Sequence, residues 1–518
     1  MNILFVYPLI PETFWSLTHS IRYLGSKAIA PPYALLILGS LLKELRPEWS
    51  LRLIDENVCK LKEEDIVWAD YIFISAMLIQ KDNTQKVIEK CNGFKKPIVA
   101  GGPAFIFSQE LFTGVNCFFL GEAEVLLKDF LNDLEAGTTK EVYSSLEKAD
   151  LSKSPPPDLS LIELRDYAMM PIQYSKGCPH HCDFCCVIEI DGNVHRGKST
   201  DQIIFELQAL YQAGWKGSVF FIDDNFIGKI RETKEILKKI IQWQKEHNYP
   251  FEFITQSSVV LAKDQELMSL MVKAGFISVF IGIETINEAS LREVGKTQNT
   301  DIDLIEMVNI IEGNGLRVVA GFIVGFDNDN PKIIFDSLIK FIQTTGILTA
   351  MVSLLSVLPG TKLEKRLKTE KRLKEVSSEG NTDGSLNFKP VMDEIVLLDG
   401  YKKILSIIFT FREYYKRISI SLHKVNYSVQ RRKKKITKNE IRAFFLSVWK
   451  IGILSNSRFL YWKLVIKSIF MKKKGAFASV IRWIIEGEHL ILYGRKVIEN
   501  LNVQIEKIKS ERYTEKGC

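Results

Sequence analysis

The stretch Lys-Gly-Cys-Pro-His-His-Cys-Asp-Phe-Cys-Cys, residues 176–186, decides how the rest of the chain is interpreted. Three of its cysteines are spaced as C-x3-C-x2-C, and an aromatic residue, Phe184, stands directly before the third. Thiolates this close in sequence must curl around a shared centre, and in intracellular proteins such centres are zinc or iron–sulfur clusters. Structural zinc sites need four ligands, usually from two separate cysteine pairs. No second pair follows before Cys518, so three ligands on a four-iron cluster, with one iron open to a small molecule, are favoured.

This cysteine pattern resembles the signature of the radical S-adenosylmethionine (SAM) enzymes. The resemblance implies that Cys178, Cys182 and Cys185 bind a [4Fe–4S] cluster, and that the amino and carboxylate groups of SAM chelate its open iron. Phe184 then belongs to the SAM site. Cys186 is spare, either as an extra thiol or as a small buried hydrophobe. A zinc site that borrows one of the nearby histidines is the alternative.

Composition places the chain among globular intracellular proteins. It has 518 residues, of which 46% are hydrophobic and 25% charged, enough for two to four domains. No basic leader precedes the first predicted strand, and no apolar run reaches the roughly 18 residues of a transmembrane helix. Eight cysteines, three of them clustered, suit a reducing compartment. We therefore predict a cytoplasmic protein.

Charge is distributed unevenly along the chain. From Tyr401 to the end, 27 basic residues stand against 8 acidic ones, a balance of +19, whereas the preceding part has 42 against 54, a balance of −12. This basic tail includes the run Arg431–Lys435 and two aromatic-rich amphipathic segments, Ile441–Lys450 and Phe459–Lys472. Three interpretations stay open: a plain helical cap with a solvated basic face, peripheral contact with the inner face of a membrane, and nucleic-acid binding. No RNA-binding signature accompanies the charge, so no nucleic-acid partner is expected.

Residues 1–145 alternate apolar strands with helices such as Tyr33–Leu45. Strands that are apolar throughout belong to a parallel sheet covered on both faces, so we predict an α/β, doubly wound, Rossmann-like domain. The predicted strands are Ile3–Tyr7, Leu51–Asp55, Tyr71–Ser75, Pro97–Ala100 and Cys117–Leu120.

Small residues follow three of these strands, where doubly wound sheets bind ligands. They either let a cofactor approach the backbone or only make turns. No G-x-G-x-x-G follows the first strand, which disfavours a dinucleotide. The segment resembles instead the cobalamin-binding domain of one branch of radical SAM enzymes, and Asp-x-His-x-x-Gly is absent around His19, which implies cobalamin bound without a histidine ligand. The implied cobalamin residues are Ser75, Ala76, Met77, Gly101, Gly102, Gly121 and Glu122.

Residues 146–168, with three prolines at 155–157, are predicted to be an extended linker. A second strand–helix series then occupies residues 169–362. Six strands separated by helices predict a partial (β/α)6 barrel with its chemistry at the strand ends. Thr200 and Asp201 are placed to cap one of the helices. The strands are Met170–Tyr174, Ser218–Ile222, Phe251–Gln256, Ser278–Glu284, Arg317–Val324 and Met351–Ser356.

Polar residues follow four successive strands of this series, although strand-end carboxylates often only cap the next helix. The radical SAM resemblance assigns them to the SAM amino group, to the ribose hydroxyls and, for the last strand, to the adenine. The implied residues are Asp223, Asp224 and Asn225 for the amino group, Gln256, Ser258 or Glu284 for the ribose, and Phe322, Ile323 and Val324 for adenine.

The resemblance extends over most of the chain. The motifs Glu12-Thr13-Phe14-Trp15 and Leu358-Pro359-Gly360-Thr361, with the basic helical region 363–518, look like the cobalamin-dependent group that contains the hopanoid C-2 methylases. This resemblance implies a methyltransferase acting on an unactivated carbon of an apolar, hopanoid-like lipid, with a flavodoxin- or ferredoxin-type reductant. The alternatives are a cyclising or rearranging cobalamin-dependent radical SAM enzyme and, from another class, a zinc-stabilised nucleic-acid-binding protein.

Overall fold

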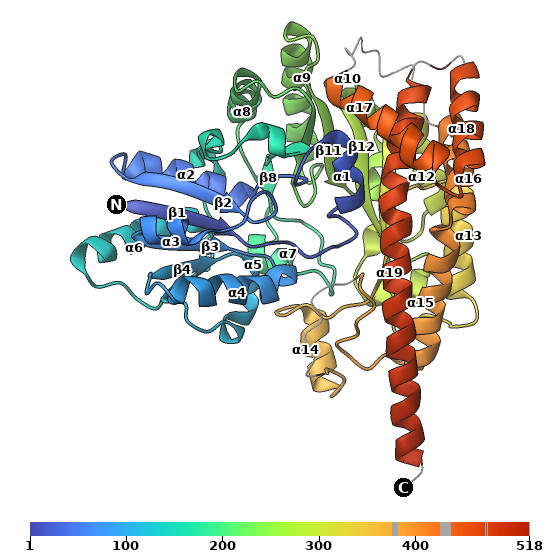
Figure 1. The fold of residues 1–518 in the computed structure, drawn as a ribbon. Coiled ribbons are helices and arrows are strands. Elements are labelled where there is room, and N and C mark those ends of the chain that lie inside the picture. Colours follow the sequence, from blue (N-terminus) through green and yellow to red (C-terminus); the bar gives the residue numbers. More distant parts are fainter. Residues whose placement is uncertain (375–381, 425–436, 472, 474, 517–518) are drawn as a thin grey trace. The chain divides into compact units, whose positions relative to one another are not determined.

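The computed structural model describes residues 1–374, 382–424, 437–471, 473 and 475–516 (Figure 1). These residues form two compact units. Unit 1 contains residues 1–12, 26–179 and 186–224, and unit 2 contains residues 13–25, 180–185 and 225–518. The chain therefore passes from one unit to the other inside the cysteine-rich stretch.

Unit 1 contains a parallel six-stranded sheet in the order β2-β1-β3-β4-β5-β6. The predicted doubly wound fold is confirmed, because one apolar cluster includes residues of α3, α4 and α5 and the other includes residues of α2 and α6. The strands are β1 (Asn2–Tyr7), β2 (Ser50–Asp55), β3 (Tyr71–Ser75), β4 (Ile98–Gly101), β5 (Cys117–Leu120) and β6 (Val142–Ser144). The helices are α2 (Tyr33–Leu45), α3 (Glu63–Trp68), α4 (Lys81–Asn92), α5 (Pro103–Ser108) and α6 (Ala123–Ala136). Strand β6 was not predicted, because two of its three residues are exposed and it lacks an apolar run.

The segment predicted to be an extended linker contains three short 3-10 turns on either side of the three prolines at 155–157: η3 (Leu151–Lys153), η4 (Leu159–Leu161) and η5 (Leu164–Asp166). The remaining strands of unit 1 then follow. Strand β7 (Met169–Ile172) pairs in parallel with β10 (Ser218–Phe221), and β8 (Ser175–Lys176) pairs antiparallel with β9 (Arg196–Gly197). Two helices, α7 (Val187–Asp191) and α8 (Thr200–Gln212), complete the unit.

The predicted cap of α8 was wrong by one residue. Ser199, not Thr200 or Asp201, accepts a hydrogen bond from the backbone of Gln202 at 3.2 Å, and the Gln202 side chain accepts one from the Ser199 backbone at 2.8 Å. Only Ser199 has the extended backbone that a capping residue needs, whereas Thr200 is already helical.

Unit 2 contains four parallel strands in the order β14-β13-β12-β11, each connected to the next through helices. This repeated strand–helix pattern confirms the α/β class predicted from the sequence. The strands are β11 (Glu252–Ser257), β12 (Phe276–Glu284), β13 (Arg317–Val324) and β14 (Ala350–Leu354). The helical segments are α9 (Ile230–Glu246), η6 (Val259–Lys263), α10 (Gln265–Ala274), α11 (Glu288–Glu293), η7 (Thr297–Asn299), α12 (Leu304–Gly313), α13 (Ile334–Thr345) and α14 (Lys362–Thr369).

The rest of unit 2 is helical, as predicted. Its 41-residue helix α19 (Ala476–Lys516) contacts α15, α16, α18 and the short N-terminal helix α1 (Thr18–Leu24). A hydrogen bond of 2.7 Å from Ser20 to the carbonyl of Ile485 fixes α1 to α19. The other elements are α15 (Glu394–Ile408), α16 (Phe411–Lys424), α17 (Lys438–Ser447), the π-helical turn η8 (Val448–Ile453) and α18 (Arg458–Phe470). The basic run Arg431–Lys435 lies outside the described residues.

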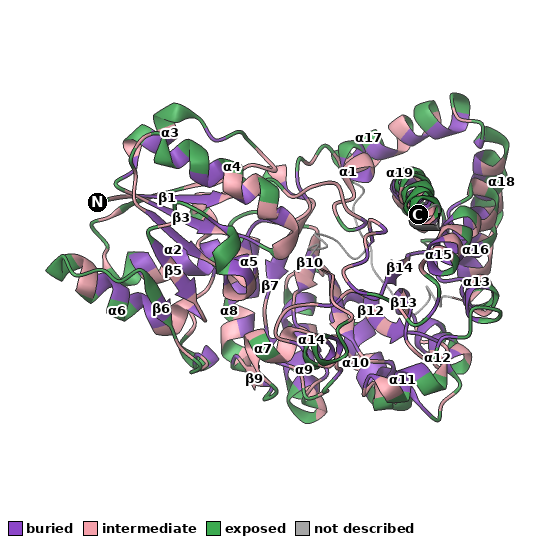
Figure 2. Cartoon of the chain, turned by 90° about the horizontal axis from the view of Figure 1, so that it is seen from below, coloured by how far each residue is buried: buried purple, intermediate pink, exposed green. Residues whose placement is uncertain are grey.

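Among the described residues, no helix combines the length and the apolar character needed to cross a membrane. Figure 2 shows β1, β3 and β13 mostly in the colour of buried residues, whereas α17 and α18 carry exposed residues along their length.

We expect Phe130→Ala to destabilise unit 1 by about 3–5 kcal/mol, because the ring is fully buried and its removal leaves a cavity. Phe130 lies within 5.9 Å of the rings of Phe73, Phe119 and Tyr143, measured between centroids. Chemical denaturation followed by circular dichroism measures the loss. The matched control Phe205→Ala, at a side chain that is 60% exposed, should change stability by less than about 0.5 kcal/mol. Equal effects of the two substitutions would contradict the assignment of Phe130 to the core.

Candidate functional site

The first predicted cluster ligand, Cys178, follows a glycine that no other residue could replace without strain. Gly177 has φ +88°, and a Cβ atom there would lie 2.5 Å from the carbonyl oxygen of Val194. The Cys178 amide donates to the carbonyl of Gly192 at 3.3 Å. Within unit 1, the loop that begins the cysteine motif is therefore fixed against the segment around Gly192 and Val194.

Two carboxylates predicted at the SAM site hold the chain that leads into this loop. Asp223 is fully buried and accepts hydrogen bonds from the Tyr174 amide at 3.1 Å and from the amide and hydroxyl of Ser175. Burial raises the pKa of Asp223 to about 7, although these donors favour the charged form. Asp224 accepts from the Gly177 amide at 3.3 Å, and burial, together with the charge of Asp191, raises its pKa to about 7.

The second and third predicted ligands lie in unit 2 and form a tight turn. The Cys185 amide donates to the carbonyl of Cys182 at 3.1 Å. Cys182 is buried, and burial raises the pKa of its thiol, while Cys185 is half-buried. The ring centroids of Phe184 and Phe326 are 6.3 Å apart, and Phe326 lies just after the end of β13.

A segment that the sequence analysis missed, residues 294–299, lines this turn. The Asp183 amide donates to the carbonyl of Val294 at 2.9 Å. Gly295, with φ +68°, approaches so closely that a Cβ atom would lie 2.9 Å from the His181 carbonyl oxygen. The side-chain amide of Gln298 donates to the sulfur of Cys182 at 3.9 Å. This segment therefore supplies both a backbone contact and a side-chain donor to the cysteine turn.

Lys296 brings a buried positive charge to the same place. Its ammonium group lies 2.7 Å from the Glu284 carboxylate at the end of β12. Burial opposes the charge of Lys296, but Glu284 and the thiolates of Cys182 and Cys185 raise its pKa above the ordinary value. Glu284, predicted at the SAM ribose, thus has one of its oxygens in an ion pair, and its backbone has the rare φ of +66°.

The other predicted SAM residues of unit 2 lie at the ends of β11 and β13 or just after β10. Asn225 is buried, and its side-chain oxygen has no hydrogen-bond partner among the described residues, so it can still accept from a ligand. Gln256 and Ser258 are half-buried at the end of β11. Phe322 and Val324 are buried, and Phe322 packs on Phe341 of α13, so Ile323 points to the opposite face of the sheet.

That opposite face carries apolar side chains. Gly321 lies there, and a Cβ atom would lie 2.9 Å from the Phe280 ring and 3.7 Å from the Met351 methyl group. Trp15, from the N-terminal stretch that belongs to unit 2, lies 5.5 Å from Phe280 between ring centroids, and its indole nitrogen is 3.0 Å from the Met351 sulfur. The Trp15 side chain is nevertheless 44% exposed, so this apolar surface is accessible.

In unit 1, the predicted cobalamin residues end three neighbouring strands. Ser75 of β3 pairs with Gly101 of β4, and the Ala76 amide donates to the Gly101 carbonyl at 3.3 Å. Gly102 has φ +100°, and a Cβ atom there would lie 3.0 Å from the Ala76 carbonyl oxygen. The Met77 amide donates to the Gln80 side chain at 2.8 Å. The ends of β3 and β4 therefore pack closely on each other through their backbones, and Gly102 leaves no room for a side chain between them.

Gly121 and Glu122 follow β5. The Glu122 side chain already has partners within unit 1. Its carboxylate forms an ion pair with Arg196, accepts from the Ala149 amide at 2.9 Å and lies 3.8 Å from Lys176. Burial opposes its charge, but Arg196 and Lys176 lower the pKa of Glu122. Lys176 and Arg196 face each other across the β8–β9 pair, so Glu122 fixes the strand that leads into the cysteine loop.

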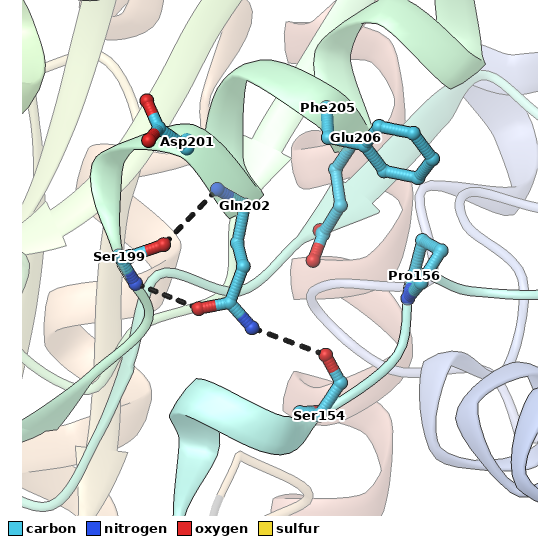
Figure 3. Close-up of a pocket in the computed structure, with 7 residues that line it drawn as sticks. All are labelled: Ser154, Pro156, Ser199, Asp201, Gln202, Phe205 and Glu206. Carbon is cyan, nitrogen blue, oxygen red and sulfur yellow. Dashed lines mark hydrogen bonds between the residues drawn. The ribbon is translucent and has the colours of Figure 1, made fainter.

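A separate cavity of about 310 Å³ lies in unit 1, between α8 and the proline-containing segment (Figure 3). Glu206 lines it and also forms a buried ion pair with Lys198, whose ammonium group donates to the Tyr33 hydroxyl at 3.0 Å. None of the predicted cofactor residues lines this cavity, which is formed by Ser154, Pro156, Ser199, Asp201, Gln202, Phe205 and Glu206.

Comparison with protein families gives two matches. Residues 172–338 match the radical SAM superfamily, and residues 361–503 match a domain of unknown function, DUF4070. An uncharacterized methyltransferase of Synechocystis sp. is 34% identical over 100% of this chain and 96% of its own length. The hopanoid C-2 methylase of Rhodopseudomonas palustris is 28% identical over 96% of this chain and 94% of its own.

Two solved structures share the fold. The cobalamin-dependent radical SAM enzyme OxsB, with aqua-cobalamin and SAM bound, superposes with a TM-score of 0.63 at 15% identity, covering 99% of this chain and 80% of its own. The radical SAM methyltransferase TsrM from Kitasatospora setae, with cobalamin and a [4Fe–4S] cluster bound, gives 0.59 at 14% identity, covering 95% and 99%.

These likenesses leave no support for the zinc-stabilised nucleic-acid-binding alternative. With a relative 34% identical along its full length and a radical SAM match around the cysteine loop, the chain belongs to the radical SAM enzymes, in the same methyltransferase family as that relative, and it is similar to the hopanoid C-2 methylase along most of its length.

Proposed function

We propose that this enzyme transfers a methyl group to an unactivated carbon of an apolar, hopanoid-like lipid. The observation that carries the proposal is the match to the hopanoid C-2 methylase over 96% of the chain, which includes both the cysteine loop and the helical C-terminal region. The chemistry comes from the cofactors: a cluster and SAM that generate a carbon radical, and cobalamin that supplies the methyl group.

We assign Cys178, Cys182 and Cys185 as the cluster ligands. The donor set fits an iron–sulfur cluster, because the thiolate charge of Cys182 and Cys185 is opposed by Lys296, and Cys182 receives a hydrogen bond from Gln298. For SAM, Asn225 offers an unpaired buried acceptor. Asp223 positions the cysteine loop through the backbone. Phe184, Asp224, Gln256, Ser258, Glu284, Phe322, Ile323 and Val324 complete the proposed SAM set.

We assign cobalamin to the ends of β3, β4 and β5, because ligands of doubly wound sheets bind at the carboxyl ends of the strands and glycine there can let a cofactor approach the backbone. The proposed cobalamin residues are Ser75, Ala76, Met77, Gly101, Gly102, Gly121 and Glu122, of which Glu122 also forms an ion pair with Arg196. His19 belongs to unit 2, where its ring lies 5.5 Å from that of His489 between centroids. Because Asp-x-His-x-x-Gly is absent around His19, we propose that residues 1–145 bind cobalamin without a histidine ligand to the cobalt.

The apolar surface of Trp15, Phe280 and Met351 supports an apolar substrate, because such a surface can hold hydrocarbon while excluding water from a radical. A lipid of this kind resides in a membrane, so peripheral membrane contact is part of the proposal. A flavodoxin- or ferredoxin-type protein is the proposed reductant.

The proposed reaction predicts a methylated lipid product. Enzyme reconstituted anaerobically with iron, sulfide and cobalamin should transfer the label of methyl-labelled SAM to an extracted lipid, detected by mass spectrometry. SAM cleavage with an altered but unlabelled product would support the cyclising or rearranging alternative. If neither a labelled lipid nor SAM cleavage were detected, the result would contradict a radical SAM function.

Substituting the three cluster cysteines tests the site assignment. The triple variant Cys178→Ala, Cys182→Ala, Cys185→Ala should lose the brown chromophore and SAM cleavage together, because three ligands are the minimum for an open-iron cluster. Cys186→Ala is the matched control and should keep both, since it lies one position outside the motif. Iron and acid-labile sulfide analysis measures the result. Survival of the chromophore in the triple variant would show that the assignment is wrong.

Lys296 and Gln298 should tune the cluster. Positive charge and hydrogen-bond donors to sulfur stabilise the reduced cluster. Lys296→Gln or Gln298→Leu should therefore lower the equilibrium constant for one-electron reduction of the cluster about tenfold, which lowers its reduction potential by ~59 mV. Redox titration followed by electron paramagnetic resonance measures this without turnover. Lys296→Arg, which keeps the charge, should stay near the wild type. A changed SAM affinity with an unchanged potential would contradict a tuning role.

A further inference from the structure

The helical region of unit 2 exposes an unusual group of large apolar side chains on α17, η8 and α18. Their exposed fractions run from 39% for Trp462 to 80% for Phe470. We call this group the aromatic face. It consists of Ile441, Phe445, Trp449, Ile453, Leu454, Phe459, Trp462, Ile466, Ile469 and Phe470. Isolated exposed apolar residues are ordinary, but ten within the thirty residues from 441 to 470 indicate an interaction surface.

Helical spacing places these residues on continuous stripes. In α18 the exposed positions are 459, 462, 466, 469 and 470, which recur every three or four residues, whereas Tyr461, Leu464 and Val465 are buried on the other side. In α17 and the following turn, positions 441, 445 and 449 recur every four residues, while Ala443 is buried. Each helix therefore has one face packed into the unit and one apolar face in solvent.

Contacts across the turn η8 hold the end of α17 and the start of α18 together. The Trp462 indole donates to the Gly452 carbonyl at 2.9 Å, and the hydroxyls of Ser447 and Tyr461 are 3.0 Å apart. Gly452 lies so close to α18 that a Cβ atom would be 2.9 Å from the Tyr461 ring. The exposure of the aromatic face thus results from how these helices pack.

Basic residues are interleaved with the aromatic face. Residues 437–471 contain six lysines and arginines and one acidic residue, Glu440. Five of the basic side chains are exposed, and the sixth, Lys467, is half-buried. The basic residues are Lys438, Arg442, Lys450, Arg458, Lys463 and Lys467. Charge of one sign beside exposed aromatic rings matches the interface of an anionic lipid bilayer.

We infer that the aromatic face binds an anionic membrane surface, with its rings among the lipid headgroups and its lysines and arginines on the phosphates. A second copy of the chain fits less well, because a symmetric interface would bring the basic residues of both copies together. The inference deepens the proposed function, since it names the surface that would bring the enzyme to a membrane-resident substrate. Its evidence is independent of methyl transfer.

Vesicle sedimentation of the full-length protein, without cofactors, tests the inference. Binding to vesicles of mixed phosphatidylcholine and phosphatidylglycerol should exceed binding to pure phosphatidylcholine and should weaken at high salt. The double variant Phe459→Ser, Phe470→Ser should bind about tenfold more weakly, because two exposed rings no longer enter the interface. The matched control Phe205→Ser, at an exposed ring of α8, should bind like the wild type.

A charge variant separates the electrostatic contribution to vesicle binding from the apolar one. Lys438→Gln with Lys463→Gln should weaken binding at low salt and should match the wild type at high salt, where screening has already removed their contribution. Circular dichroism confirms that each variant keeps its helix content, and size-exclusion chromatography reports the oligomeric state. Equal vesicle binding by wild type and the Phe459→Ser, Phe470→Ser variant would overturn the inference. So would a wild-type dimer that this variant converts to monomer without a change in vesicle binding.

The two proposals can fail separately. Vesicle binding with no methylated product would leave the aromatic face as a lipid surface and refute the proposed reaction. Methylation of a detergent-dispersed lipid by a protein that does not bind anionic vesicles would support the proposed reaction and refute the membrane inference.

Discussion

The buried carboxylate of Asp223 holds the chain on which the cysteine loop depends. A charged carboxylate without partners is costly to bury, and here two backbone amides and one hydroxyl compensate for the lost water. Its pKa of about 7 in the fold lies above the ordinary value of 3.8, so this group makes folding less favourable as the pH rises from about 4 to 7. The residues that Asp223 holds, Tyr174 and Ser175, directly precede Lys176 and Gly177. Burying this carboxylate therefore costs stability but holds the residues that lead into the cysteine motif.

A second set of contacts secures the other end of the motif within unit 2. Gly295 and Val294 meet the backbone at His181 and Asp183, and this brings Lys296 and Gln298 to the cysteine turn. Groups around the ligands of a metal centre set its charge and hydrogen bonding, so they affect its chemistry as much as the ligands do. Asn299 holds this segment in turn, through hydrogen bonds of 3.0 Å to the carbonyls of Gly282 and Ile283 at the end of β12.

Unit 2 also brings together apolar side chains from distant parts of the chain. Trp15 comes from the N-terminal stretch, yet it packs on Phe280 and Met351 of the strands. The same stretch is tied to α19 through Ser20 and through His489, whose ring nitrogen lies 3.2 Å from the Thr13 and Phe14 carbonyl oxygens. Helix α19 in turn contacts α18, which carries part of the aromatic face. The apolar strand surface and the helix with exposed rings thus belong to one packed unit.

The sequence by itself determined the cysteine spacing, the parallel sheet of unit 1 and the strand–helix series of unit 2, because these depend on local patterns: ligands three and four residues apart and strands apolar along their length. Only the tertiary structure decided the surroundings. Lys296 and Gln298 lie more than a hundred residues beyond Cys182 and carry no local signal, since their role arises from where β12 ends. The rings of α18 look alike in sequence whether buried or exposed, and packing on one side alone determined which of them face solvent.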